Sequence, residues 1–536
     1  MILQTPSHRS STGTPTRDII GAIGLRHLEQ LVAFDSASDE RSATIPSTEG
    51  QRVLADWLAT FFRSQGAEVE VDDHGNVLAA LPGRGAGADL PPLAMMAHLD
   101  TARGTAPLPA LHRLPRWDGQ RVPYPANPSL CVDIPTYPAT ATFRGQELVF
   151  GDGKAPFGLD DKLGLAHIMT LAVLLRRNET IEHPPLLLCA RPDEEIGRMA
   201  AVEGLADELA RRGVRIGWTI DGIVPFEINV ENFYAAGAAV RFADAPDAML
   251  PALRGALAVH LGGVNTHGAT AKAEGHRAAV RLAVELCAEL QQQGLADAVL
   301  AASLVCDPLR DCDGELTLAV TTEAPADIAD RVAAAAVKVV GPHVPRGASF
   351  AVRPVSTDEV SAAAADGLRR SLDFVRALLA ERAVLPVAAE DSEGRQGYSQ
   401  PYRIRRDGDA TVVDVRLRDF DDDQLRLRGE IVGKTAGDDA TVQLVEQYVN
   451  MGPRLRDVAE LAELPARAAE TIGVKAEILP IRGGTGVDPF LDRGVFVANL
   501  GTGYFAPESE KEFTSVEQIA DHARWLLALV QRAALG

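Results

Sequence analysis

The sequence is poor in cysteine, in aromatic residues and in positive charge. Its five cysteines include no Cys-x-x-Cys pair, so neither a disulfide framework nor a thiolate zinc site is expected. A formal net charge of -21 repels the phosphate backbone, which argues against nucleic acid as a partner. The first residues lack the apolar core of a secretory signal, and no stretch reaches the roughly 20 apolar residues of a membrane helix. These absences predict a cytoplasmic protein that binds neither nucleic acid nor membrane.

The order of elements predicts an α/β protein with an inserted domain. A chain of 536 residues is too long for one ordinary core, so two or more domains are expected. After a tail predicted to be disordered at 1–16, apolar strands alternate with amphipathic helices through 17–227, which is typical of a mixed sheet covered by helices. Alternating strands and Ala-rich helices then predict an α+β domain at 228–448, and 449–536 returns to the first pattern. No internal repeat is evident in the sequence.

The first group of residues that could support chemistry lies in MAHLDT, which closes an apolar strand. His98 and Asp100 are two residues apart, so in an extended chain both side chains point the same way. This spacing lets His98 bind a metal through one ring nitrogen while Asp100 accepts the N–H of the other. The alternative is a structural histidine at a strand end, which is the commoner situation for such a residue taken alone.

Three further groups of acids follow along the chain. They are Asp160 and Asp161 before a helix in GLDDKLG, Glu194 and Glu195 after a buried strand in PDEEIG, and Asp221 after another in TIDG. Taken singly, each group has an ordinary explanation, such as helix capping or an exposed acidic loop. Carboxylates and imidazoles that converge at the strand ends of one sheet would instead replace the water shell of divalent metal ions.

In combination, these motifs resemble the M20 metallopeptidases, in particular those of the peptidase T type. The similar segments span most of the chain. They are FDSASDERSATIPSTEGQ, AHLDTA, FRGQELVFGDGKAPFGLDDKLG, RPDEEIG, IDG, THGATAK, EGRQGYSQPY, VRLRDFD, QYVNM and PIRGGT. The resemblance implies a metal-dependent exopeptidase-type mixed sheet covered by helices, with the inserted α+β domain as a lid. It also implies two divalent metal ions, with zinc expected before manganese or cobalt.

The resemblance assigns ligands to those two ions. His98 and Asp221 would hold one ion, Asp160 would bridge to the other, and Glu195 would bind the second. The family's last ligand is a histidine four residues before a Glu-Phe pair, and this chain has Glu508 in that position. Glutamate is a suitable ligand for zinc or manganese. The departure therefore leaves two alternatives, a binuclear site with more negative charge or a weakened second site.

The resemblance also implies the catalytic and substrate-binding residues. Glu194 would be the general base, and Asp100 would orient His98. His267 in THGATAK would stabilise the oxyanion of the tetrahedral intermediate. Arg482 in PIRGGT would bind the substrate carboxylate, because a planar guanidinium suits two oxygens.

The activity implied by the resemblance is removal of the N-terminal residue of short peptides. Two alternatives remain open: an amidohydrolase acting on N-acyl amino acids or small amides, and a metal-binding homologue whose catalysis is weakened at Glu508. The chain is also longer than the resemblance requires, with a large extra block at roughly 300–388. That block could enlarge the lid, form a homodimer interface or restrict substrate size, and the sequence does not decide among these.

Overall fold

The computed structural model describes most of the chain. The described residues are 15–264, 277–308, 310, 312–321, 325–380, 397–481 and 483–535. The tail predicted at 1–16 lies outside this part except for its last two residues, and the first helix begins at Arg17.

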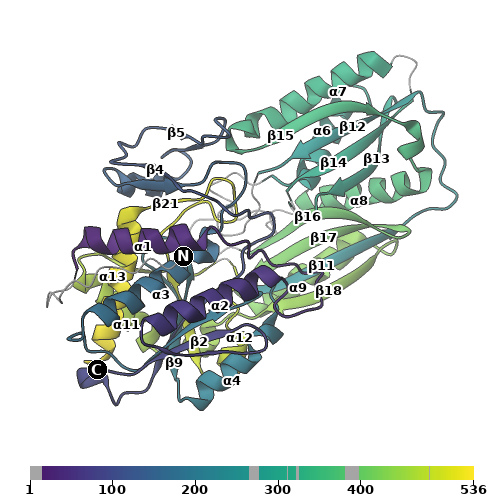
Figure 1. The fold of residues 1–536 in the computed structure, drawn as a ribbon. Helices are drawn as coiled ribbons and strands as arrows, with labels where there is room; N and C mark the ends of the chain where they lie inside the picture. The colour runs from purple at the N-terminus through teal and green to yellow at the C-terminus, as the bar shows by residue number, and fades with distance from the viewer. Residues whose placement is uncertain are drawn as a thin grey trace.

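A mixed eight-stranded sheet forms the centre of the larger part of the molecule (Figure 1). In spatial order its strands are β1 (Glu68–Val71), β2 (Val77–Leu81), β8 (Leu186–Arg191), β3 (Leu93–His98), β9 (Ile216–Gly222), β20 (Phe496–Gly501), β10 (Glu227–Asn229) and β19 (Glu477–Ile478). The four strands β8, β3, β9 and β20 run parallel. Every residue of β3 and β8 is buried, as expected for strands covered on both faces.

Helices from both ends of the chain pack around this sheet. They are α1 (Arg17–Leu31), α2 (Glu49–Ser64), α3 (Leu159–Arg177), α4 (Glu203–Arg211), α10 (Gly452–Leu455), α11 (Glu460–Thr471), α12 (Asp488–Asp492) and α13 (Val516–Ala533). The α3 helix contacts β3 and β9, and it is itself covered by α1 and α13. This arrangement confirms the predicted α/β fold. Within the described residues, no helix is long and apolar enough to cross a membrane.

A small accessory layer lies beside the main sheet. Its strands are β4 (His112–Leu114), β7 (Leu148–Phe150) and β21 (Phe513–Ser515) in one sheet, with β5 (Val122–Pro123) and β6 (Cys131–Val132) in another. An aromatic cluster that includes Trp117, Phe143 and Phe513 fills its core. Because β21 joins the layer just before α13, the layer anchors the C-terminal loop that carries Glu508.

The inserted domain contains two four-stranded antiparallel sheets, each with two helices. The first, which we call the host unit, comprises β11 (Tyr234–Ala243), α8 (Ala362–Ala380), β16 (Tyr398–Asp407), β17 (Ala410–Asp419), α9 (Asp422–Ala436) and β18 (Thr441–Tyr448). The second, which we call the nested unit, comprises β12 (Gly255–Gly262), α6 (Ala279–Gln292), β13 (Val299–Cys306), β14 (Gly314–Val320), α7 (Pro325–Val340) and β15 (Ser349–Val355). The nested unit is inserted between the first strand and the first helix of the host unit.

The two units share one topology. In both, the chain order is strand, helix, strand, strand, helix, strand, and the spatial strand order is fourth, first, third, second. The second strands, β13 and β16, lie side by side, and each first helix packs on the second strand of the other unit. The inserted domain therefore has an approximate internal two-fold arrangement (Figure 1). The sequence showed no repeat, because two units can share a topology when only their hydrophobic patterns are similar and their individual residues are not. The extra block at 300–388 supplies much of the nested unit.

Two buried histidines in the helical layer predict acid sensitivity. The rings of His167 and His522 stack at 5.4 Å. His167 donates from Nε2 to the Thr502 carbonyl, while His522 donates from Nδ1 to Gln518 and accepts from the backbone of Phe226. Burial lowers the pKa of His167 to about 3 and that of His522 to about 4. Both rings are therefore neutral in the folded protein.

Stability should fall as the pH drops below 6.5, the model value for histidine. In that range the unfolded chain binds protons that the folded chain does not, and each histidine contributes up to about 1.4 kcal/mol per pH unit. We expect the loss to continue until the pH nears 4 for His522 and 3 for His167. Urea unfolding between pH 8 and pH 4 measures the free energy of unfolding as a function of pH. His167→Gln should reduce the slope of that curve by the equivalent of about one proton. An unchanged curve in that variant would contradict the assignment.

Candidate metal centre

The carboxyl ends of three adjacent parallel strands meet at the predicted site. His98 closes β3 and pairs in register with Arg191 at the end of β8. Asp221 lies near the end of β9 on the other side of β3. Asp160, which was expected at the start of a helix, lies in the first turn of α3. Its backbone is not helical there, which turns its side chain toward the ends of the sheet strands.

His98 contacts carboxylates through both ring nitrogens. Its Nδ1 lies 2.9 Å from the backbone oxygen of Asp100 and 3.4 Å from a carboxylate oxygen of the same residue. Its Nε2 lies 2.9 Å from Asp160 Oδ1 and 3.3 Å from Asp221 Oδ1. Asp100 therefore sits on the Nδ1 side, which leaves Nε2 facing the two carboxylates predicted to share a metal with it. A histidine that binds metal is commonly oriented in this way through its other nitrogen.

Asp100 also fixes the backbone of the two adjacent glutamates. Its Oδ1 accepts the backbone N–H of Glu194 at 3.0 Å, and its Oδ2 accepts that of Glu195 at 3.1 Å. The preceding Asp193 has a φ of 56°, a value that a non-glycine residue adopts at some cost in energy. Its carboxylate is held by the Ser47 hydroxyl at 2.5 Å and by Gln51 at 2.8 Å. The Glu-Glu turn is thus constrained from both sides.

The start of α3 is held by partners that the sequence did not reveal. The Tyr504 hydroxyl donates to Asp160 Oδ2 at 2.9 Å. The neighbouring Asp161 accepts the backbone N–H groups of His98 and Gly164. Asp161 therefore fastens the helix start to the end of β3. In the sequence, the adjacent Asp160 was the only indication that Asp161 would be buried among carboxylates.

Another buried acid joins the Glu508 loop to the same helix start. Glu512 Oε2 accepts three backbone N–H groups, from the residues 157, 158 and 159. Its Oε1 accepts the N–H of Glu508 at 3.1 Å. Burial raises the pKa of Glu512 to about 8. The Glu-Phe pair of the sequence motif thus has a positioning role, because it places Glu508 and Asp160 relative to each other.

The crowding of acids raises their affinity for protons. Burial, Glu508 and Asp160 raise the pKa of Glu195 well above its usual range. Burial also raises the pKa of Asp221 and brings that of Glu194 to about 7. Burial alone would lower the pKa of His98, yet the surrounding carboxylates raise it well above its usual value. Each shift indicates negative charge that the protein itself does not compensate.

The donor set fits divalent cations. Two groups of three side chains place ligand atoms within 4.8 Å of one another: His98, Asp161 and Asp221, and His98, Asp160 and Glu195. Among the described residues, no hydrogen-bond partner lies at the buried Oε1 of Glu195. A buried carboxylate oxygen without a partner is costly unless a cation binds it. Imidazole with several carboxylates is a combination that zinc and manganese accept.

Arg191 is a buried cation beside these acids that sequence reasoning missed. Its guanidinium lies 3.5 Å from Glu194 Oε1 and 3.8 Å from Asp221 Oδ2. It also donates to the carbonyls of Thr485 and Gly486. The signal was present in the sequence, because an arginine directly before an acidic turn in ARPDEEIG would be costly to bury unpaired.

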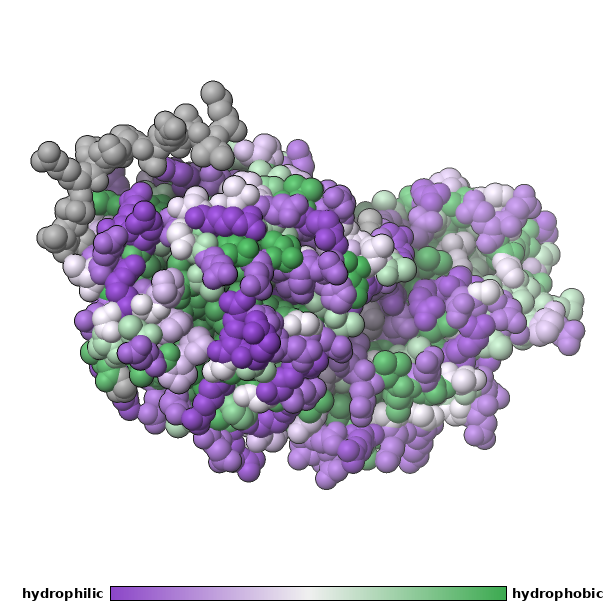
Figure 2. All heavy atoms as spheres, turned by 60° about the horizontal axis from the view of Figure 1, so that its bottom comes forward, coloured by the Kyte–Doolittle hydropathy of each residue, from purple (hydrophilic) through white to green (hydrophobic). Residues whose placement is uncertain are grey.

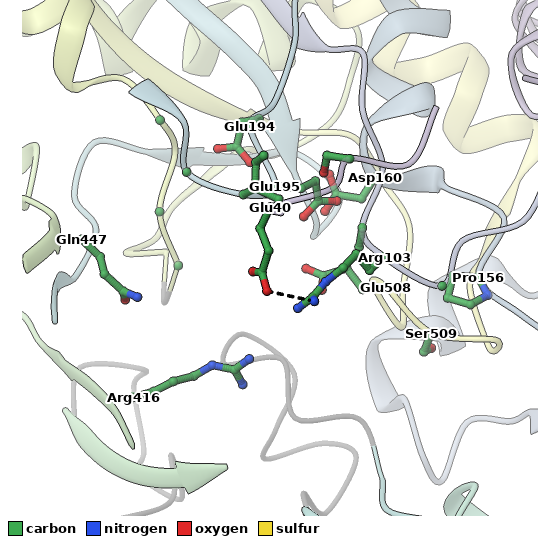
Figure 3. Close-up of a pocket in the computed structure, with 18 of the residues that line it drawn as sticks. Glu40, Arg103, Pro156, Asp160, Glu194, Glu195, Arg416, Gln447, Glu508 and Ser509 are labelled. Carbon is green, nitrogen blue, oxygen red and sulfur yellow. Dashed lines mark hydrogen bonds and ion pairs between the residues drawn. The ribbon is translucent and has the colours of Figure 1, made fainter. Parts of the chain in front are cut away.

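The acids open into a cavity of about 720 Å³ between the central sheet and the inserted domain. Figure 3 shows Glu194, Glu195 and Asp160 at one end of it, with Glu508 nearby and Arg416 on the opposite wall. Figure 2 shows the surface hollowed between the two parts of the molecule. A space of this size is typical of small-molecule and peptide sites. The structure therefore brings the five predicted metal ligands to one region, although Glu508 belongs to neither three-residue group.

Two predicted site residues are not placed. His267 and Arg482 both lie outside the described residues. The neighbours of Arg482, Ile481 and Gly483, line the cavity. The roles assigned to the two residues from the sequence stay predictions.

Comparisons with known proteins agree with the resemblance. No protein-family model matches the chain. The peptidase T of Geobacillus sp. (strain WCH70) is 22% identical over 519 residues, which cover 95% of this chain and 97% of that protein. The aminopeptidase PepT of Bacillus cereus ATCC 10987 has 17% identity, covers 96% of this chain and 99% of its own, and superposes with a TM-score of 0.52.

A tripeptidase structure from Staphylococcus aureus gives a TM-score of 0.55 at 13% identity, covering 98% of this chain and 100% of its own. These structures share the fold, including the central and inserted parts. The curated relatives match this chain along nearly its whole length, and they are peptidases. The chain is therefore a homologue of peptidase T and a hydrolase.

Proposed function

We propose that this protein is a metal-dependent exopeptidase that removes the N-terminal residue of short peptides. The observation that carries the proposal is the cluster of buried carboxylates around His98, in which Glu195 has an oxygen without a hydrogen-bond partner among the residues that the structure describes. The cluster lies at the inner end of a cavity that could hold a short peptide. The similarity to peptidase T supplies the reaction class.

The proposed ligands divide into two sets. His98 and Asp221 would hold one cation, Asp160 would bridge, and Glu195 with Glu508 would hold the second. Bound divalent cations would lower the pKa of water and polarise the peptide carbonyl. Zinc is the first expectation, and manganese and cobalt have compatible ligand preferences.

The remaining steps fall to side chains of this chain. Glu194 accepts a proton from the attacking water and passes it to the leaving amine. Asp100 accepts the backbone N–H of Glu194 at 3.0 Å and so fixes the backbone position from which the base extends. Arg191 lies 3.5 Å from the same carboxylate and keeps it oriented. In this proposal His267 stabilises the oxyanion, and Arg482 binds the peptide's terminal carboxylate.

A substrate panel tests the proposal. Metal content is measured on the purified protein, which is then assayed with tripeptides, dipeptides and N-acyl amino acids in added zinc, manganese or cobalt. We expect tripeptides to lose their first residue, as identified by mass spectrometry. Hydrolysis of N-acyl amino acids alone would instead indicate a deacylase. Clearly less than two metals per chain without hydrolysis would favour a metal-binding homologue.

A further inference from the structure

Asp160 has the most demanding position among the proposed ligands, because its carboxylate has to face both cations. It lies in the first turn of α3, but its φ of -83° and ψ of 111° are not helical, so the helix does not set the direction of the side chain. Its Oδ1 lies 2.9 Å from His98 Nε2, and its Oδ2 accepts the Tyr504 hydroxyl at 2.9 Å. Asp160, His98 and Glu195 offer ligand atoms within 4.8 Å of one another, and Figure 3 shows Asp160 next to Glu195.

Only one of these two contacts is compatible with a bound cation. A histidine that binds a metal through Nε2 directs the lone pair of that nitrogen at the metal and cannot donate from it. The contact between His98 and Asp160 would therefore give way to the cation. A carboxylate oxygen has two lone pairs, so Asp160 Oδ2 can bind a cation and still accept from the Tyr504 hydroxyl. Of the two contacts, the one to the tyrosine can persist when the site is filled.

Tyr504 is held firmly by its surroundings. Its side chain is 1% exposed and belongs to the main hydrophobic core. The backbone N–H groups of Gly503 and Tyr504 both donate to the Ile223 carbonyl at 3.1 Å, just beyond Asp221 at the end of β9. The Thr514 hydroxyl donates to the Gly503 carbonyl at 2.6 Å. The tyrosine hydroxyl is therefore presented from a fixed loop, which is what a donor needs in order to hold a metal ligand in one orientation.

The charge of the site gives such a donor a purpose. The same loop carries Glu508, an anion in the position where the family has a histidine. The Glu195 carboxylate experiences the negative charges of both Glu508 and Asp160. Repulsion among these acids tends to turn their side chains apart. The hydroxyl of Tyr504 opposes that movement for Asp160.

We propose that Tyr504 is a positioning residue that sets the metal affinity of the site by holding the bridging carboxylate of Asp160 toward the cations. The inference rests on the proposed metal centre and deepens it. Tyr504 is not among the residues that line the cavity, so it acts through Asp160 and does not touch the substrate. A buried tyrosine that merely needs an acceptor for its hydroxyl would affect stability and leave metal affinity unchanged.

Tyr504→Phe tests the proposal, because it keeps the ring and removes only the hydroxyl. The metal-free full chain is titrated with zinc in competition with a chromophoric chelator. We expect the dissociation constant of the more weakly bound zinc to rise about 10- to 100-fold, the usual effect of removing an outer contact to a metal ligand. Hydrolysis of a tripeptide should fall when zinc is limiting, and kcat/KM should return close to the wild-type value once zinc saturates both positions.

Tyr124→Phe is the matched control. The Tyr124 side chain is also 1% exposed, and its hydroxyl donates at 2.6 Å to the backbone carbonyl of Lys511 in the loop that carries Glu508. This variant loses a buried hydroxyl contact to the same loop, but the acceptor is a backbone carbonyl rather than a proposed ligand. It should keep the wild-type zinc affinity.

Wild-type zinc affinity in Tyr504→Phe would overturn the inference. An equal weakening in Tyr124→Phe would also overturn it, because the effect would then come from anchoring of the loop. A loss of kcat/KM that saturating zinc does not recover would place the hydroxyl in the reaction itself, again against the inference. Zinc binding without hydrolysis in the wild type would refute the proposed peptidase function alone, because the zinc affinities of the variants still decide the role of Tyr504. A wild type that binds no zinc would refute both.

Discussion

Glu194→Gln is expected to retain bound metal and to lose peptide hydrolysis by about 10³-fold, the usual contribution of a positioned general base. Glutamine has nearly the same shape as glutamate, so the hydrogen bond from the backbone of residue 194 to Asp100 is unaffected. What the amide cannot do is accept a proton from water near neutral pH. The loss should therefore appear in kcat, with KM little changed.

Two measurements make this result specific. Metal analysis of Glu194→Gln should match the wild type, because the proposed ligands are other residues. Glu203→Gln, an exposed acid in the first turn of α4, should keep both metal and activity. Retained hydrolysis in Glu194→Gln would remove the residue from the mechanism. A parallel loss of metal would show that Glu194 is a ligand rather than the base.

How much of the site could be predicted depended on the kind of element that carries each residue. His98, Asp221 and the Glu-Glu pair follow apolar strands, and adjacent parallel strands bring their carboxyl ends together. Strand pattern alone therefore predicted their convergence. Asp160 arrives from the first turn of α3, held by Tyr504 from a segment 344 residues away. Local pattern carries no information about such a distant contact, so only the resemblance could predict its place.

The inserted domain shows the same limit at the level of the fold. The sequence predicted strands and helices at 228–448, but it did not indicate that they form two units of identical topology. Nesting separates β11 from its own helix α8 by the whole of the nested unit. Chain order then no longer matches spatial order, because β11 pairs with β17 and β18 rather than with β12. Sheet pairing over such a distance depends on packing between units, which hydrophobic periodicity does not encode.

The second metal position depends on Glu508, whose geometry is unusual. Its φ of 52° is a value that costs a non-glycine residue energy and is often found at functional sites. The backbone N–H of Glu508 donates to Glu512, which holds this conformation. The residue lines the cavity, and its negative charge raises the pKa of Glu195. Two neighbouring carboxylates repel each other when both are ionised, so a shared cation would stabilise the pair.

Glu508→Ala is therefore expected to reduce bound metal from about two ions to about one per chain, and to lower kcat/KM by at least on the order of 100-fold, since loss of even an outer contact to a metal ligand can cost that much. Glu510→Gln is the matched control: it lies two residues away and pairs with Arg310 instead, so it should keep both metals. Metal analysis after dialysis, together with kcat/KM on a tripeptide, measures the effect. Full metal content and activity in Glu508→Ala would show that the second cation is held without this residue. A single ion in the wild type would show that glutamate does not replace the family's histidine as a ligand.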